Sequence, residues 1–275
     1  MRILIVAQRE IKLGFRNAWT YSFLILLTFF TAVILLLQTS SATSDGYTDM
    51  TGTIMNMTLY LLPLITLLLG GFSTAAEKED GQWGLLSTYP ISAYIFLWGK
   101  WLGLATVLLT IIFFSFGVSG LLTFFFGVTL PFQSFIFYLF FSVALSLVYL
   151  SIAFLIGSIT RNRWETLISG IAIWFLTIII WPLLMISVLS QLPSYQLIRP
   201  FLEGLTVLNP AEFIRVFSII RMGAGSAFGA EYAQWIVWAT SRYGFVVFFA
   251  IFLVWIFVAV FVGGFIWSRG EKNAE

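Results

Sequence analysis

Long apolar stretches separated by short polar breaks dominate the chain. Six of these stretches have about the 20 apolar residues that a helix needs to cross a lipid bilayer. Pro182 is expected to kink or interrupt the fifth, because proline lacks the amide proton of a regular helix. We therefore predict an all-α, polytopic membrane protein with one domain over residues 1–275. The predicted spans are 19–37, 54–76, 98–126, 135–159, 166–189 and 243–267.

The composition fits a lipid environment. Of the 275 residues, 60% are hydrophobic, 19% aromatic and 9% charged, whereas soluble domains carry about 25% charged residues. The chain has no cysteine and no histidine, which excludes disulfides, thiolate or imidazole metal sites and Ser-His-Asp catalysis. A net charge of +2 is too small to indicate nucleic-acid binding. We expect no enzyme activity, and no cofactor or metal in this chain.

Residues 1–17 predict a short helix that lies on the membrane surface. On a helical wheel Arg2, Arg9, Lys12 and Arg16 fall within an arc of about 80°. Apolar residues fall on the opposite side, although Ile5 lies among the cations. A narrow basic face of this kind favours contact with lipid phosphates. An ordinary positive flank in front of a membrane span is the alternative.

The positive charges predict which ends of the spans face the cytoplasm, because short cytoplasmic loops are rich in Lys and Arg. The first loop on the other side, 38–53, carries two aspartates and no cation, and the third, 127–134, carries no charge. The long segment 191–242 has four arginines, but long loops translocate largely regardless of charge. Both termini are therefore predicted to be cytoplasmic. The cations assigned to cytoplasmic segments are Arg2, Arg9, Lys12, Arg16, Lys78, Lys100, Arg161, Arg163, Arg269 and Lys272.

The segment 191–242 is too polar to span the bilayer and too apolar for a plain linker. Asn209 and Pro210 predict a helix start, as N-cap and first helical residue, and Glu212 can reach back to the N-cap amide. Glu212 and Arg215 then form an i,i+3 pair. A second amphipathic piece leads into the last span. We expect an external cap of short helices on the outer leaflet; connecting structure that only closes the bundle is the alternative.

The most charged break in the apolar pattern lies at residues 75–92, between the second and third spans. Glu77, Lys78, Glu79 and Asp80 follow one another there, and such charges must lie in water beside the membrane. A solvated loop could have this composition. A short helix that a soluble motor protein pushes is the more specific interpretation. Two glycines that can form tight turns, Gly81 and Gly84, follow the charges. Trp83, Leu85 and Leu86 add a small group of apolar side chains, and Pro90 ends the segment.

Other kinds of site have weaker support. The only Gly-Lys pair, Gly99-Lys100, is followed by Trp101, so the chain has no phosphate-binding loop. The cores of the spans carry no charged residue, which argues against ion-coupled carriers, voltage sensors and charge-lined channels but not against a carrier of lipid-like substrates. The methionines at 50, 55 and 57 could offer soft ligands to Cu(I), but flexible packing is the simpler interpretation.

Residues 77–92, E-K-E-D-G-Q-W-G-L-L-S-T-Y-P-I-S, resemble the signature of ABC-2 type permeases. Gln82 departs from it, since Thr or Ser is commoner there, and the Gly99-Lys100 pair that usually follows is present. The resemblance covers the whole chain. It implies the membrane subunit of a prokaryotic ABC transporter, in the plasma membrane, that forms a dimer, with a homodimer expected. A separate ATPase subunit would bind ATP and Mg²⁺. The residues implied to form the coupling helix that contacts this ATPase are Glu77, Lys78, Glu79, Asp80, Gly81, Trp83, Leu86 and Pro90.

The run L-N-P-A-E-F-I-R at 208–215 resembles a stretch after the fifth span in permeases of the nitrous-oxide-reductase maturation type. Those permeases work with an ATPase and a periplasmic protein that serves copper-site assembly. The resemblance therefore implies that Asn209, Pro210, Glu212 and Arg215 serve an external partner. The alternative is a conventional exporter of a lipid-like, peptide or drug-like substrate. An intramembrane enzyme is disfavoured, because no nucleophile–base pair is visible without histidine or cysteine.

Overall fold

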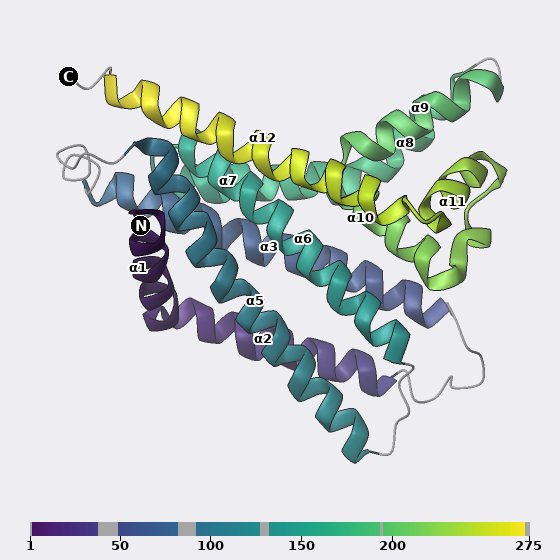
Figure 1. Cartoon of the computed structure of the whole chain (residues 1–275), viewed down its shortest axis with the longest axis horizontal. Helices are drawn as coiled ribbons and strands as arrows, with labels where there is room; N and C mark the ends of the chain where they lie inside the picture. Colours follow the sequence, from purple (N-terminus) through teal and green to yellow (C-terminus); the bar gives the residue numbers. More distant parts are fainter. Residues whose placement is uncertain (1, 38–48, 82–91, 127–131, 193–194, 273–275) are drawn as a thin grey trace.

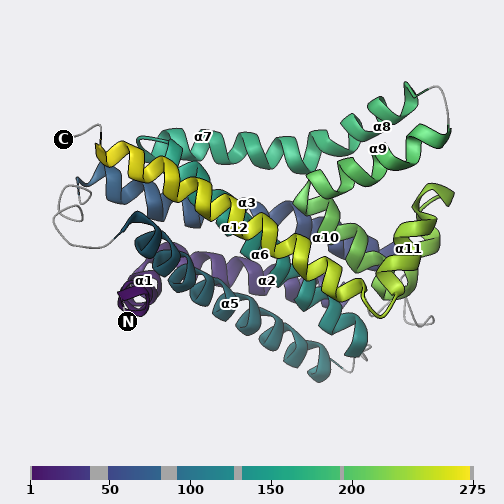
Figure 2. The same cartoon turned by 45° about the horizontal axis from the view of Figure 1, so that its top comes forward.

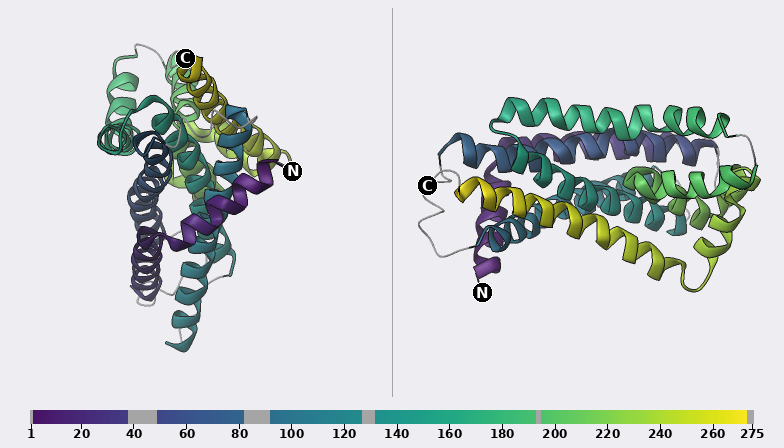
Figure 3. Two further views of the ribbon diagram at one scale, coloured as in Figure 1. Left: turned by 90° about the vertical axis from the view of Figure 1, so that its left-hand side faces the viewer. Right: turned by 90° about the horizontal axis from the view of Figure 1, so that it is seen from above.

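The computed structural model is a bundle of long helices, crossed at one end by a short helix (Figures 1 and 3). It describes residues 2–37, 49–81, 92–126, 132–192 and 195–272. All regular structure within these residues is helical, so the all-α prediction is confirmed. The helices are α1 (Arg2–Arg16), α2 (Ala18–Leu37), α3 (Asp49–Glu79), α5 (Ala93–Phe125), α6 (Phe132–Ile159), α7 (Arg163–Trp174), η2 (Phe175–Ile180), α8 (Trp181–Ser190), α9 (Tyr195–Leu208), α10 (Pro210–Ile219), η3 (Ile220–Ala224), η4 (Gly225–Ala227), η5 (Ala230–Tyr232), α11 (Ala233–Thr240) and α12 (Gly244–Lys272).

Five helices are long and apolar enough to cross a membrane, and each corresponds to a predicted span. The remaining predicted span corresponds to α2, in which Ala18–Val33 forms a shorter apolar helix. The count of six spans therefore remains a prediction. The five long helices are Met55–Glu79, Ala93–Phe125, Phe132–Ile159, Arg163–Ser190 and Gly244–Ser268.

The segments that the charge pattern assigned to one side of the membrane lie at one end of the bundle. This end, called the α1 end below, gathers α1, the end of α3, the start of α5, the α6–α7 turn and the end of α12 (Figures 1 and 2). At the opposite end, called the far end, α2 and α5 terminate and α8 is followed by α9. Segments that lie on the same side of a membrane must gather at the same end of the bundle, and these segments do. Which side faces the cytoplasm stays a prediction.

The central helix of the bundle is α6, which packs against α3, α12 and α5. Phe141 and Tyr149 on α6 are fully buried. The contact with α3 is close, because Gly70 faces α6 so tightly that a Cβ atom there would lie 2.8 Å from Leu150 Cδ1. Small residues allow this kind of approach between membrane helices. The α3–α6 pair therefore forms the core on which the other helices pack.

The helix predicted over residues 1–17 is present as α1, and it lies across the long helices rather than along them (Figure 3). Its four predicted cations are exposed. Its buried residues are Val6, Ala7, Glu10 and Gly14. A crosswise helix with an exposed basic face has the geometry that a surface-lying helix needs. Its contact with the membrane stays a prediction.

Two glycines of α5 determine where α1 crosses it. Gly99 and Gly103 are four residues apart and so share one face of α5. A Cβ atom at Gly103 would lie 2.7 Å from the carbonyl oxygen of Ala7 and 2.5 Å from Glu10 Cβ. No larger residue fits at this position unless α1 moves.

The helix that corresponds to the fifth predicted span, Arg163–Ser190, is called the fifth long helix below, with α2 counted as the first. It is continuous, but its winding changes before Pro182. The π-helical segment η2 separates α7 from α8, and Pro182 lies in the first turn of α8. Proline cannot complete the helical hydrogen-bond ladder and its ring displaces the preceding carbonyl. A wider turn is a common way to accommodate this. The predicted interruption is thus a widening of the helix, and it lies on the N-terminal side of the proline.

The segment between the fifth and last long helices differs from the predicted external cap. Every residue of α10 except Arg215 is buried, and α10 packs against α6. Asn209 Nδ2 donates a 2.6 Å hydrogen bond to the carbonyl oxygen of Thr177 in the middle of the fifth long helix. A helix that is apolar on all sides is stable inside a bundle rather than on a surface. α10 is therefore enclosed by other helices rather than lying on a surface of the bundle, and the position of this segment relative to the outer leaflet stays a prediction.

The start of α10 is the predicted one, but its capping differs in one respect. Asn209 Oδ1 accepts the amide of Ala211 at 3.0 Å, as an N-cap should. The Asn209 amide donates to Leu205 of α9 at 3.3 Å, so the predicted contact from Glu212 to this amide is wrong. Glu212 instead accepts from Arg215 at 2.9 and 2.6 Å. The predicted i,i+3 pair is thus confirmed.

We predict that Gly103→Leu will destabilise the protein by roughly 1–3 kcal/mol or more, because overpacking must displace α1. Gly117 lies on the same helix with open space around it. Gly117→Leu should therefore be neutral or slightly stabilising, since leucine is the better helix former. Unfolding of both purified variants in detergent measures the difference. Equal stabilities would show that α1 does not pack on α5 in this way.

Candidate functional site

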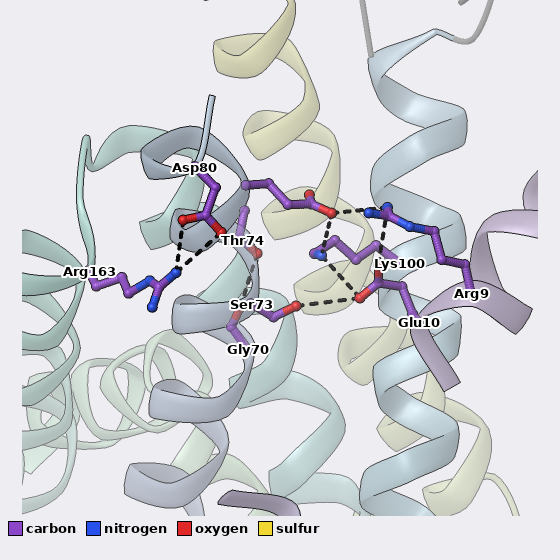
Figure 4. Close-up of polar contacts among 9 residues, drawn as sticks. Arg9, Glu10, Gly70, Ser73, Thr74, Asp80, Lys100 and Arg163 are labelled. Carbon is purple, nitrogen blue, oxygen red and sulfur yellow. Dashed lines mark hydrogen bonds and ion pairs between the residues drawn. The ribbon is translucent and has the colours of Figure 1, made fainter. Parts of the chain in front are cut away.

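Four consecutive charges at the end of α3 are directed to three different groups of neighbours. Figure 4 shows Asp80 directed to Arg163, and Arg9, Glu10 and Lys100 gathered on the other side of α3. Glu77 contacts α1 and α5, and Lys78 contacts the end of α6. Glu79 and Asp80 contact the start of α7. Successive side chains of a helix point about 100° apart, so a continuous run of charges reaches neighbours on several sides. The C-terminus of α3 therefore contacts α1, α5, the end of α6 and the start of α7.

Glu77 belongs to a cluster of two acids and two bases with Arg9, Glu10 and Lys100. Lys100 Nζ lies 3.0 Å from Glu10 Oε2 and 3.1 Å from Glu77 Oε1. Arg9 Nη1 lies 3.2 Å from Glu77 Oε1 and 3.6 Å from Glu10 Oε1. Lys100 is 1% exposed, Glu10 2% and Glu77 5%. Equal numbers of opposite charges make the cluster neutral overall, which the burial of ionised groups requires.

The hydrogen bonding of this cluster is incomplete within the described part of the chain. Ser73 Oγ donates to Glu10 Oε2 at 3.4 Å. Glu10 Oε1 and Glu77 Oε2 are buried, and neither accepts a hydrogen bond from a described residue. Buried polar groups without a full set of partners make a network sensitive to small displacements. Movement of α1, α3 or α5 relative to the others therefore changes the energy of the cluster.

Lys78 joins α3 to the end of α6. Its Nζ donates to the carbonyl oxygens of Ser158 and Thr160 at 2.6 and 2.9 Å. It also lies 5.0 Å from the ring centroid of Trp267 on α12. Carbonyl groups at a helix C-terminus have no helical partner and attract a cation. Lys78 thus completes the end of α6 and holds α3 close to α12.

Glu79 and Asp80 both contact Arg163 at the start of α7. Arg163 Nε lies 3.4 Å from Glu79 Oε2, and Arg163 Nη2 lies 3.2 Å from Asp80 Oδ1. All three side chains are about half exposed. Exposed pairs of this kind stabilise by only about 0–1 kcal/mol. They position α7 beside α3 and remain accessible to a partner.

The structure assigns different surroundings to the predicted coupling residues. Glu77 is buried with internal ion pairs, whereas Glu79 and Asp80 are accessible. Gly81 has φ of 67°, a conformation that favours glycine and makes the predicted turn. Trp83, Leu86 and Pro90 lie outside the described residues.

The residues predicted to serve an external partner are mostly internal. Asn209, Pro210 and Glu212 are buried, and the Arg215 side chain is partly exposed. The methionines suggested as soft ligands also diverge, since Met55 is fully buried and Met57 is exposed. Met50 has no described side chain.

Sequence reasoning missed Glu10 as a site residue. The available signal was its position as the single acid in a basic helix, at the edge of the apolar side and away from the four cations. Lys100 was noted as a cytoplasmic cation and as part of a motif, but not as a buried partner of an acid. Their pairing joins residues 90 positions apart, so no local pattern indicates it.

Comparison with known proteins decides the family. Residues 4–271 match the family described as ABC-2 family transporter protein. The chain belongs to this family. Like other members, this ABC-2 permease is a multi-pass membrane protein, the transmembrane and non-catalytic part of an ABC transporter. Permeases of this kind associate with an ATPase subunit. The predictions of family, membrane location and absence of enzyme activity agree with this assignment.

Two curated proteins resemble this ABC-2 permease over most of their length. Both are described as a probable ABC transporter permease protein NosY. The protein from Stutzerimonas stutzeri is 27% identical over 232 residues, which cover 82% of this chain and 84% of the relative. The protein from Pseudomonas aeruginosa is 26% identical over 231 residues, with the same coverage. A stretch of this length includes the middle of the chain, with Glu77, Lys100 and α10.

We predict that Lys100→Met will destabilise the permease by roughly 3–5 kcal/mol, because removing one partner leaves buried charges uncompensated. Arg163→Gln, which removes an exposed partner, should change stability by less than about 1 kcal/mol. The double variant Lys100→Met/Glu10→Gln should recover part of the loss, since Arg9 and Glu77 can still pair. Denaturant unfolding in mixed micelles measures all three. If Lys100→Met is no more harmful than Arg163→Gln, the buried cluster does not exist in the membrane protein.

Proposed function

We propose that this permease couples ATP hydrolysis by a separate ATPase subunit to movement across the plasma membrane of a prokaryotic cell. In this proposal residues 1–275 form one transmembrane domain with six spans, and the α1 end faces the cytoplasm. The excess of cations at that end supports the orientation. The crosswise basic helix α1 supports a position at the lipid surface. Two permease chains, most simply identical, would form the membrane part, while ATP and Mg²⁺ bind to the ATPase.

The observation that carries the proposal is the cluster of Arg9, Glu10, Glu77 and Lys100, of which all but Arg9 are buried. Glu77 precedes the segment 82–91 and Lys100 follows it, and Lys100 is paired both with Glu77 and with Glu10 of α1. A force applied to the segment therefore acts on α1, α3 and α5 together. Packed helices with fixed polar contacts move as bodies rather than bending locally. This arrangement suits a surface through which a soluble motor drives a membrane domain.

The predicted coupling residues divide into two roles under this proposal. Glu79 and Asp80, with Trp83 and Leu86, would contact the ATPase. Glu77 would act inside the permease, where it passes displacement to its neighbours. Lys78 would hold the end of α6. Gly81 and Pro90 would bound the coupling helix, because one permits a turn that other residues disfavour and the other stops a helix.

A second candidate is mechanical transmission to a protein outside the cell, as in maturation of nitrous oxide reductase. Both reported relatives carry the name NosY. The run 208–215 supports this candidate, because Asn209 joins α10 directly to η2. Arg215 and the helices α9 and α11 would then form the outward contact, with Asn209, Pro210 and Glu212 as the internal support. A conventional exporter of a lipid-like, peptide or drug-like substrate remains the alternative.

We predict that Glu79→Arg will uncouple ATP hydrolysis from the cellular function while membrane insertion stays intact. The change places two cations side by side at the α3–α7 contact. The readouts are ATP hydrolysis by the purified complex and complementation of a deletion strain. Gly81→Pro should have the same effect, since proline cannot adopt the positive φ of Gly81.

The charge swap Glu79→Arg/Arg163→Glu separates two explanations of that result. Restored coupling would assign the effect to the internal ion pair. Continued uncoupling in a complex that inserts and assembles would assign it to direct contact between Glu79 and the ATPase. Normal coupling in both Glu79→Arg and Gly81→Pro would remove the proposed role of this segment.

We predict that a gentle detergent pull-down of the tagged permease from its native host will recover an ATPase. An additional secreted protein in stoichiometric amount would favour the transmission candidate. An ATPase alone would favour the conventional exporter. A complex verified as intact that contains no ATPase would contradict the proposed function.

A further inference from the structure

The helical hairpin of α5 and α6 has an unusual tip at the far end. Between Lys100 and Arg161 the sequence contains no Asp, Glu, Lys or Arg, so the turn that joins these helices is uncharged. Four phenylalanines flank that turn in the described residues. Phe124, Phe125, Phe126 and Phe132 are 76%, 80%, 69% and 77% exposed. Aromatic side chains gathered this way in water would be strongly disfavoured, because the hydrophobic effect scales with exposed apolar area.

The position of α1 provides a reference for the depth of this tip. A helix that lies on the membrane sits at the boundary between headgroups and acyl chains. Val107 of α5 lies beside the C-terminal part of α1, because a Cβ atom on Gly14 would lie 2.7 Å from Val107 Cγ2. From Val107 to Phe125, α5 extends about 27 Å at 1.5 Å per residue. The hydrocarbon core is about 30 Å thick, so α5 ends near the opposite hydrocarbon boundary even if it is upright.

The inclination of α5 shortens this reach further. In Figure 1, α5 is inclined to α2, α3 and α12, so its length along their common direction is less than its contour length. Along this direction α9 and α11 extend beyond the ends of α5 and α6 in Figures 1 and 2.

We propose that the α5–α6 tip, defined by Phe124, Phe125, Phe126 and Phe132, is embedded in the lipid of the leaflet opposite α1 and does not emerge into water. Its partner is a lipid surface, because apolar rings without any charge match acyl chains. The neutral amide of Gln133 is compatible with the interfacial layer. The inference rests on the surface position proposed for α1, and it is independent of what the permease transports.

The absence of cysteine makes the proposal directly testable by single-cysteine labelling in membrane vesicles. Phe125→Cys removes a side chain that is 80% exposed and whose ring lies beside that of its neighbour Phe124. The thiolate is the form that reacts with a membrane-impermeant maleimide, and a charge is disfavoured in hydrocarbon. Cys at 125 should therefore react at least about tenfold more slowly than Gln191→Cys, a matched control at the exposed end of α8. Both should react equally after denaturation in detergent.

A second measurement identifies what surrounds the tip. A fluorophore on Phe125→Cys in nanodiscs should be quenched strongly by lipids that carry a nitroxide near the headgroup end of the chain. The same fluorophore on Leu4→Cys, 63% exposed on α1, tests the depth of α1 separately. Rapid reaction of Cys at 125 with the impermeant reagent would overturn the proposal. Spontaneous disulfide formation between two copies of Phe125→Cys, or protection only when an outer protein is bound, would overturn it as well.

Discussion

A lysine buried between two glutamates determines how the α1 end of this permease is built. Removing an ion from water is unfavourable by several kcal/mol even after relaxation of the protein, so Lys100 needs its acidic partners within direct contact. Glu10 can reach it only if α1 crosses α5 where Gly103 leaves room. Glu77 can reach it only if α3 ends at the same level. One buried charge thus fixes the relative positions of three helices.

This constraint bears on how a soluble subunit could act on the membrane domain. The segment between α3 and α5 follows Glu77 and precedes Lys100, and these two residues pair with each other, while Lys100 also pairs with Glu10 of α1. A partner that displaced only one side of the segment would have to separate buried opposite charges. Displacement of all three helices together leaves the cluster intact and is energetically the easier path. The exposed pairs of Arg163 with Glu79 and Asp80 exchange partners far more readily, because water replaces each contact.

The parts of the fold that depend on local pattern could be predicted from the sequence. Apolar runs of sufficient length indicated the long helices, and Asn209 followed by Pro210 indicated the start of α10. The site could be predicted only in part, since its pairs join positions 90 apart for Lys100 and Glu10 and 83 apart for Arg163 and Asp80. The burial of α10 was missed for a related reason. Glu212 and Arg215 make the run look polar, but they neutralise each other and leave an apolar helix.

The fifth long helix links the charged cluster's end of the molecule to the segment that contains α10. Its first part, α7, packs on α3, and its last part, α8, packs on α9. Between them lies η2, where the Thr177 hydroxyl contacts Tyr149 at 2.7 Å and the Thr177 carbonyl accepts from Asn209. A wider turn has weaker hydrogen-bond restraints than an α-helix and is the natural place for two halves to move relative to each other. Motion of α3 would therefore reach α10 through Thr177, about 20 Å along the helix from Arg163 at 1.5 Å per residue. This internal route works equally for opening a substrate path and for moving an outer surface, which explains how one architecture can serve either function.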